Sequence, residues 1–193
     1  MEKFDSAIPV RYGIIAFAAA FTTGMMMYVF YQTVVSNFMM YAAVGFISLA
    51  LVLFLAIWSG INYRREHGGI ISFQHAFLAV FTIFLFNSVA TFSTQLLINK
   101  VIDKQYAQKA SSLLKEKMTD YFDKNNIPED KAKDAMAGIG PEKFDPPLLE
   151  VLKSFLTWLG VGGIISVLIA LFIKRGSSDL IPTDSPPEPI RTI

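Results

Sequence analysis

Cysteine is absent from this chain of 193 residues, and charged side chains are absent from long parts of it. Without cysteine the chain can form no disulfide, no thiolate nucleophile and no cysteine-ligated metal site. The formal net charge is only +1, and the charged residues lie in separate segments instead of one basic face. Such a distribution supplies no field that would attract nucleic acid, so we expect no nucleic-acid partner.

Three stretches without Asp, Glu, Lys or Arg are typical of a membrane protein. They cover residues 12–63, 71–99 and 154–173, and 53% of the whole chain is hydrophobic. A membrane-spanning helix needs about 20 apolar residues at 1.5 Å each, so the first stretch is long enough to cross twice. A short polar link at 31–37 divides it. We therefore predict spans at about 13–31, 38–62, 71–99 and 152–173, with the lipid bilayer as the first partner.

Residues 100–147 form the only sizeable segment between these spans, and its apolar residues recur at helical spacing. The pattern predicts that the third span continues as an amphipathic helix to about Asp123. A short second helix is predicted near 127–138, with Pro128 at its first helical position and with Gly138 and Gly140 at its end. Asp145 is predicted to cap the last helix. The apolar positions of the first helix are Ile102, Tyr106, Ala110, Leu113 or Leu114, Met118 and Tyr121.

The predicted fold class is therefore all-α: a four-helix transmembrane bundle, residues 1–175, with a helical extracytoplasmic insertion between spans three and four. The last residues, 176–193, combine Ser, Asp and Pro with few large apolar groups. A segment of this composition cannot bury enough surface to order itself, so we expect a disordered cytoplasmic tail.

Lysine and arginine near the ends of the spans indicate the orientation. They precede span one, follow span two and follow span four, whereas the link at 31–37 carries none. Cytoplasmic loops near the ends of spans carry an excess of these residues. We expect a multi-pass protein of the inner (plasma) membrane with both termini cytoplasmic. The residues are Lys3, Arg11, Arg64, Arg65, Lys174 and Arg175.

The stretch "RREHGGIISFQHAF" at 64–77 reads as a tight cytoplasmic turn. Arg64 and Arg65 follow span two, where cations meet both the helix dipole and anionic lipid headgroups. Gly68 and Gly69 adopt positive φ angles at little cost, and Ser72 can cap the next helix. The alternative is a site formed by the histidines at 67 and 75, but two histidines lack the carboxylate or thiol complement of a metal shell. We expect no metal, cofactor or catalytic residue here.

The same residues carry a resemblance to a known family. "YRREHGGIISFQHAF" at 63–77 is similar to the Tyr-Arg-Lys-x-x-Gly-Gly-x-Ile-Ser-Phe-x-x-Ala-Phe signature of a bacterial four-helix membrane family, the domain of unknown function 4199. The resemblance extends over about 10–175 and implies four spans with a charged extracytoplasmic stretch before the last. The family has no established activity, so the resemblance implies no catalytic or binding residue.

Polar residues inside the spans are few and uncharged. Asn87, Thr91 and Gln95 recur every four residues and so share one face of span three. They either hydrogen-bond neighbouring helices, the commoner role of such groups in bundles, or line a solute path. Small residues at 16, 20 and 24 and at 162, 166 and 170 are spaced to let helices approach closely.

These features favour an accessory or regulatory protein that acts through contacts in the cell envelope, and not an enzyme. The alternative is a small-solute transporter or channel component, for which only the Asn87 face offers a polar path. The candidate contact surface is Leu113, Met118 and Tyr121. Its occupant is predicted to be either a membrane-protein partner or a second copy of this chain.

Overall fold

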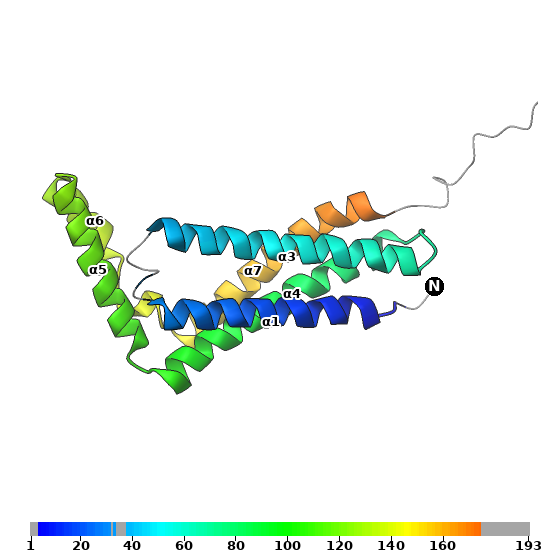
Figure 1. Cartoon of the computed structure of the whole chain (residues 1–193), viewed down its shortest axis with the longest axis horizontal. Helices are drawn as coiled ribbons and strands as arrows, with labels where there is room; N and C mark the ends of the chain where they lie inside the picture. The colour runs from blue at the N-terminus through cyan, green and yellow to red at the C-terminus, as the bar shows by residue number, and fades with distance from the viewer. Residues whose placement is uncertain (1–3, 32, 34–37, 175–193) are drawn as a thin grey trace, which may run out of the picture.

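The computed structural model describes residues 4–31, 33 and 38–174, and this part of the chain is all-helical. Four long helices form a bundle, and shorter helices form a cap, residues 103–147, at one end of it (Figure 1). We call this the cap end and the opposite end, which carries the turn at 67–72, the turn end. The elements are α1 (Ala7–Val29), α3 (Phe38–Glu66), α4 (Phe73–Leu97), the π-helix η1 (Ile98–Ile102), α5 (Tyr106–Lys124), α6 (Glu129–Ala137), the short helix η2 (Pro141–Lys143) and α7 (Leu148–Ile173).

Four helices are long and apolar enough to cross a membrane, which confirms the predicted number. Their bounds are Ala7–Val29, Ala42–Glu66, Phe73–Ile102 and Leu148–Ile173. The first begins earlier than the sequence predicted, because Arg11 marks the edge of the apolar stretch and not the end of the helix. The Asp5 carboxylate accepts the Ala7 N–H at 2.9 Å and so satisfies one donor of the first turn. The predicted tail at 176–193 and most of the link at 31–37 lie outside the described residues.

Helix α4 is the centre of the bundle, because it packs against α1, α3 and α7. The contact with α7 is close: a Cβ built on Gly162 would lie 2.9 Å from the Cβ of Phe84. The small residues predicted on α7, at 162, 166 and 170, are all buried. On α1 the Ala16 side chain is buried, but Ala20 and Gly24 are half-buried and face a cavity described below.

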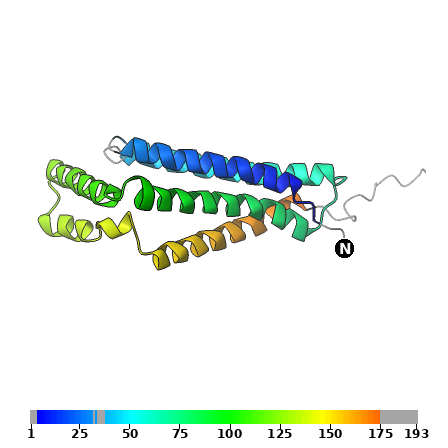
Figure 2. The same cartoon turned by 90° about the horizontal axis from the view of Figure 1, so that it is seen from below.

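The two ends of the bundle pack differently. At the turn end Ala56, Ser59 and Tyr63 of α3 are fully buried against α4 and α7. Towards the cap end α3 and α7 diverge, as both views show (Figures 1 and 2). Large apolar side chains on these diverging halves are exposed, Leu49 to 50% and Trp158 to 64%. The bundle is therefore closed at one end and splayed at the other.

The third span does not run straight into the cap, so the prediction of one helix to about Asp123 is wrong. Helix α4 continues through η1 to Ile102, and Asp103 then adopts an extended conformation with φ −142° and ψ 92°. Helix α5 starts afresh at Tyr106 and points away from the direction of α4 (Figure 1). The break follows from Asp103, whose carboxylate accepts the Gln105 N–H at 3.0 Å and competes with the helical hydrogen bond.

The starts of the last two cap elements also differ from the predictions. Pro128 precedes α6 instead of opening it, because its ψ of 138° is extended. Asp145 does not cap α7: Pro147 stands at the capping position, and the Asp145 carboxylate pairs with Lys100 Nζ at 2.6 Å. The Asp145 carboxylate, which the local sequence pattern predicted at the start of α7, therefore pairs instead with Lys100, a residue close in space but distant in sequence.

Candidate functional site

The splayed half of the bundle encloses a cavity of about 740 Å³ between α1, α3, α4 and α7. Its floor is the cap-end half of α4, and its walls on α3 and α7 include Leu49 and Trp158. Both of these side chains are exposed, and α3 and α7 diverge at this end of the bundle (Figures 1 and 2). The cavity therefore opens sideways between α3 and α7. Its polar lining residues are Thr23, Ser48, Asn87, Ser88, Thr91, Thr94, Gln95, Asn99, Tyr106, Lys143 and Ser154.

The predicted polar face of span three lies on the floor of this cavity. The Thr91 hydroxyl donates to the Asn87 carbonyl oxygen at 3.0 Å, within its own helix. Among the described residues, the side-chain amides of Asn87 and Gln95 make no hydrogen bond, and both are half-buried. The structure therefore does not use this face to bridge helices but leaves two amides facing the cavity.

Asn99 is a further member of this face that the sequence analysis missed. Its Nδ2 donates to the Phe144 carbonyl oxygen at 2.7 Å and holds the end of the cap against η1. Its Oδ1 is buried without a hydrogen-bond partner. The signal was present in the sequence, because Asn99 continues the four-residue spacing of Asn87, Thr91 and Gln95.

The turn end below the cavity is closed by an aromatic cluster around Tyr63. The Tyr63 ring stacks on His67, with centroids 4.2 Å apart, and on Phe4 at 5.3 Å. His67 Nδ1 lies 2.8 Å from the Tyr63 carbonyl oxygen, and His75 meets the edge of the same ring. The two histidines are thus packing groups, and the described residues contain no group of three or more His, Cys, Asp or Glu placed to hold a metal ion.

The predicted turn at the end of α3 is confirmed in its backbone, and Arg64 has an additional role. Gly68 and Gly69 have φ angles of 71° and 83°, and the Ser72 hydroxyl accepts the His75 N–H at 3.3 Å. Arg64 donates to the carbonyl oxygen of Ile173 at 3.1 Å, at the end of α7. A guanidinium in this position satisfies a terminal carbonyl and opposes the negative end of the helix dipole. Arg65 is exposed.

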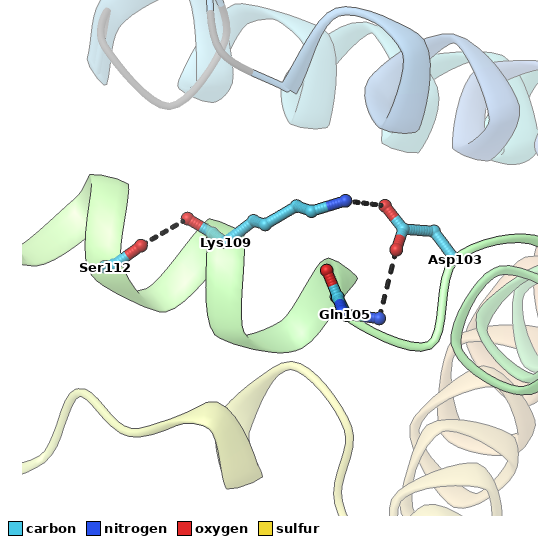
Figure 3. Close-up of polar contacts among 4 residues, drawn as sticks. All are labelled: Asp103, Gln105, Lys109 and Ser112. Carbon is cyan, nitrogen blue, oxygen red and sulfur yellow. Dashed lines mark hydrogen bonds and ion pairs between the residues drawn. The ribbon is translucent and has the colours of Figure 1, made fainter.

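Charged contacts also lie within the cap, at the break after η1. Lys109 Nζ donates to Asp103 Oδ2 at 2.9 Å, while Asp103 Oδ1 accepts the Gln105 N–H (Figure 3). The hydrogen bond from Lys109 holds the pKa of Asp103 below its ordinary value, and the same bond raises the pKa of Lys109. Ser112 donates to the Lys109 carbonyl oxygen at 3.0 Å within α5.

The predicted contact residues of α5 are only partly covered. Tyr121 is 60% exposed, while Leu113 and Met118 are half-buried. The covered face of α5 carries Ala107, Ala110 and Ser111 instead of the bulkiest apolar residues. The cap thus buries its small residues and presents Tyr121 outward.

The fold and this site define a class: a bundle of four apolar, membrane-type helices with a small polar cap and a cavity at the cap end. A family model described as "Protein of unknown function (DUF4199)" matches residues 11–175, so the chain belongs to that family, as the turn motif predicted. Neither the curated proteins nor the solved structures contain a match to this chain.

Proposed function

We propose that this chain is a multi-pass protein of the inner (plasma) membrane that acts as an accessory or regulatory protein through its cap. In this arrangement both termini and the turn at 67–72 are cytoplasmic, and residues 103–147 lie outside. The positive charges near the turn end support the orientation, because Arg64, Arg65 and Lys174 all lie there. Charges of both signs along the cap support its place in water.

The observation that carries the proposal is the position of α5 and α6. Helix α5 packs on α6 and on η2, and the far end of this helix pair extends beyond the bundle in both views (Figures 1 and 2). Tyr121 is exposed in this projecting part. Aromatic residues are enriched at protein interfaces, so a projecting helix pair with an exposed tyrosine suits a contact with a membrane-protein partner or a second copy.

Photo-cross-linking tests this proposal. A photoreactive phenylalanine analogue at position 121 should give one discrete adduct in intact membranes, whereas the same group at Lys104, exposed but close to the bundle, should not. With the photoreactive group kept at position 121, changing Leu113 and Met118 together to Ser should abolish the adduct without changing membrane insertion. Unchanged cross-linking would mean that the cap serves only as a lid on its own bundle.

The cavity favours a second candidate, a small-solute transporter or channel component. Polar groups line it from the middle of α4 to the cap end. The layer below it, however, contains the fully buried residues Ala56, Ser59, Tyr63, Val80 and Ile83, so a transport cycle requires the turn end to open. Uptake of a solute into liposomes that contain only this chain would favour this second candidate over the first.

A further inference from the structure

We propose that the cavity binds a neutral, hydroxyl-bearing amphiphile of the membrane, such as a monoacylglycerol. Its head hydrogen-bonds the amides of Asn87 and Gln95, and its apolar chain leaves between α3 and α7. This goes beyond the proposed function, because it assigns a ligand site to the bundle, whereas the accessory function concerns the cap.

The size and opening of the cavity fit such a ligand. Its volume of about 740 Å³ lies within the roughly 300–1,000 Å³ of small-molecule sites. The residues at its side opening are apolar and exposed on membrane-type helices, and they include Leu49, Leu51, Trp158 and Val161. A ligand that enters by this route comes from the bilayer and must carry apolar surface.

The polar side chains of α4 on the floor of the cavity determine which ligand head can bind there. Asn87 and Gln95 each offer both a donor and an acceptor, and neither side chain is hydrogen-bonded within the described residues. The hydroxyls of Thr91 and Thr94 already donate to carbonyl oxygens of α4, at 3.0 and 2.8 Å. The amides of Asn87 and Gln95 are therefore unpaired, as is the buried Oδ1 of Asn99 at the cap end. Amides left unpaired in an apolar region are costly.

The absence of charge from this floor favours a neutral head over an ion or a phosphate. Lys143, at the cap end, is the one charged residue among those that line the cavity. An anionic head would have to remain beside Lys143, where Asn99 bonds the adjacent Phe144. It would leave Asn87 unsatisfied, because Asn87 lies about three helix turns, roughly 18 Å, before Asn99. A glycerol-type head carries hydroxyls that both donate and accept, so it can satisfy both amides.

Photolabelling of the purified full chain in phospholipid nanodiscs tests the inference. A monoacylglycerol with a diazirine in its chain should label α3, α4 and α7 saturably, and unlabelled monoacylglycerol should compete. Changing Asn87 and Gln95 together to Leu should weaken saturable labelling about tenfold, because two hydrogen bonds are lost. Thr82→Val is the matched control: Thr82 lies on the same helix but does not line the cavity.

A second pair of variants tests whether the ligand occupies the volume of the cavity, independently of the hydrogen bonds. A Cβ built on Gly45 or on Gly160 meets no atom within 4 Å, so both sites accept a larger side chain. Gly45 lines the cavity and Gly160 does not. Gly45→Phe should therefore reduce saturable labelling, and Gly160→Phe should leave it unchanged.

Three outcomes would overturn the inference. Labelling that does not saturate and is equal in all variants would show annular lipid only. Stronger competition by phosphatidylglycerol than by monoacylglycerol would show that the head is an anion. Equal competition by free glycerol would show that the apolar chain is not recognised and that the ligand does not enter from the bilayer.

Discussion

At the scale of single residues, two glycines of α7 lie in different surroundings: Gly162 is at a close helix contact and Gly160 is at an open surface. A Cβ on Gly162 would lie 2.9 Å from Phe84, whereas a Cβ on Gly160 would meet nothing within 4 Å. Gly162→Ala should lower the free energy of unfolding by about 1–3 kcal/mol, the usual cost of overpacking. Gly160→Ala should change it by less than about 0.5 kcal/mol. Thermal unfolding in mild detergent measures both, and equal effects would contradict the close α4–α7 contact.

The two arginines at the end of α3 form a second matched pair. Arg64 donates to the Ile173 carbonyl oxygen, and Arg65 is exposed. Arg64→Met should lower the free energy of unfolding by about 1 kcal/mol, because a charged hydrogen bond to a helix end is lost. The melting temperature should fall by about 2–4 °C. Arg65→Met should change it little; an equal loss from both would show that the contact with α7 does not stabilise the bundle.

The sequence predicted the residues of this turn well because their properties are local. Positive φ at Gly68 and Gly69 and the cap at Ser72 depend on neighbours a few residues away. The partner of Arg64 is 109 positions distant, and that of Asp145 is 45 positions distant. No local pattern indicates such partners. The sequence therefore predicted contacts of Arg64 with the dipole of its own helix and with headgroups, and it predicted Asp145 at a helix start.

At the scale of elements, the junction between η1 and α5 determines the direction of the cap. The Lys109 hydrogen bond holds the pKa of Asp103 below its ordinary 3.8, so this contribution to stability is present above pH 3.8 and is lost as the pH falls through the lowered value. The pKa of Lys109 is raised above 10.5, so its contribution is present below pH 10.5 and is lost as the pH rises through the raised value. The junction should therefore be insensitive to pH across the neutral range.

Spin labels at positions 22 of α1 and 124 of α5 measure this prediction. The distance distribution should be narrow at pH 7 and should broaden below pH 3.8, as Asp103 is protonated. Asp103→Asn should broaden it already at pH 7, and the variant should then respond less to acid. A label pair at positions 22 and 156, both exposed within the bundle, is the control and should not respond to the variant. A narrow distribution in Asp103→Asn would contradict the role of this contact.

The existence of the helices was predictable, but this break was not. Apolar residues keep a helical spacing from Ile98 to Tyr121, so periodicity alone runs straight through Asp103. The chain changes direction because the Asp103 carboxylate accepts hydrogen bonds from the Gln105 N–H and from the Lys109 ammonium. These bonds compete with the helical hydrogen bonds, and the spacing of apolar residues does not indicate them. The apolar runs that predict four spans, in contrast, follow from the length of helix a bilayer requires.

At the scale of the whole molecule, the bundle has two unlike ends. The turn end is closed around Tyr63 and carries Arg64, Arg65 and Lys174, whereas the cap end is splayed and carries a cavity and a projecting helix pair. The sequence predicted the polar face of α4, because its spacing of four is regular. The sequence could not predict the cavity, because the cavity forms where α3 and α7 diverge, and the residue pattern of one helix does not indicate how two helices pack.

Cysteine accessibility tests whether the two ends of the bundle lie on opposite sides of a membrane, with the cap outside. The chain has no cysteine of its own, so single substitutions report without background. Ser112 is the suitable position in the cap, because it is exposed whereas Ser111 is only 4% exposed. Glu66 is exposed at the turn end.

Ser112→Cys should react with an impermeant maleimide in intact cells, and Glu66→Cys should react only after the membrane is permeabilised. Labelling of both positions in intact cells, or of Glu66→Cys alone, would contradict this orientation.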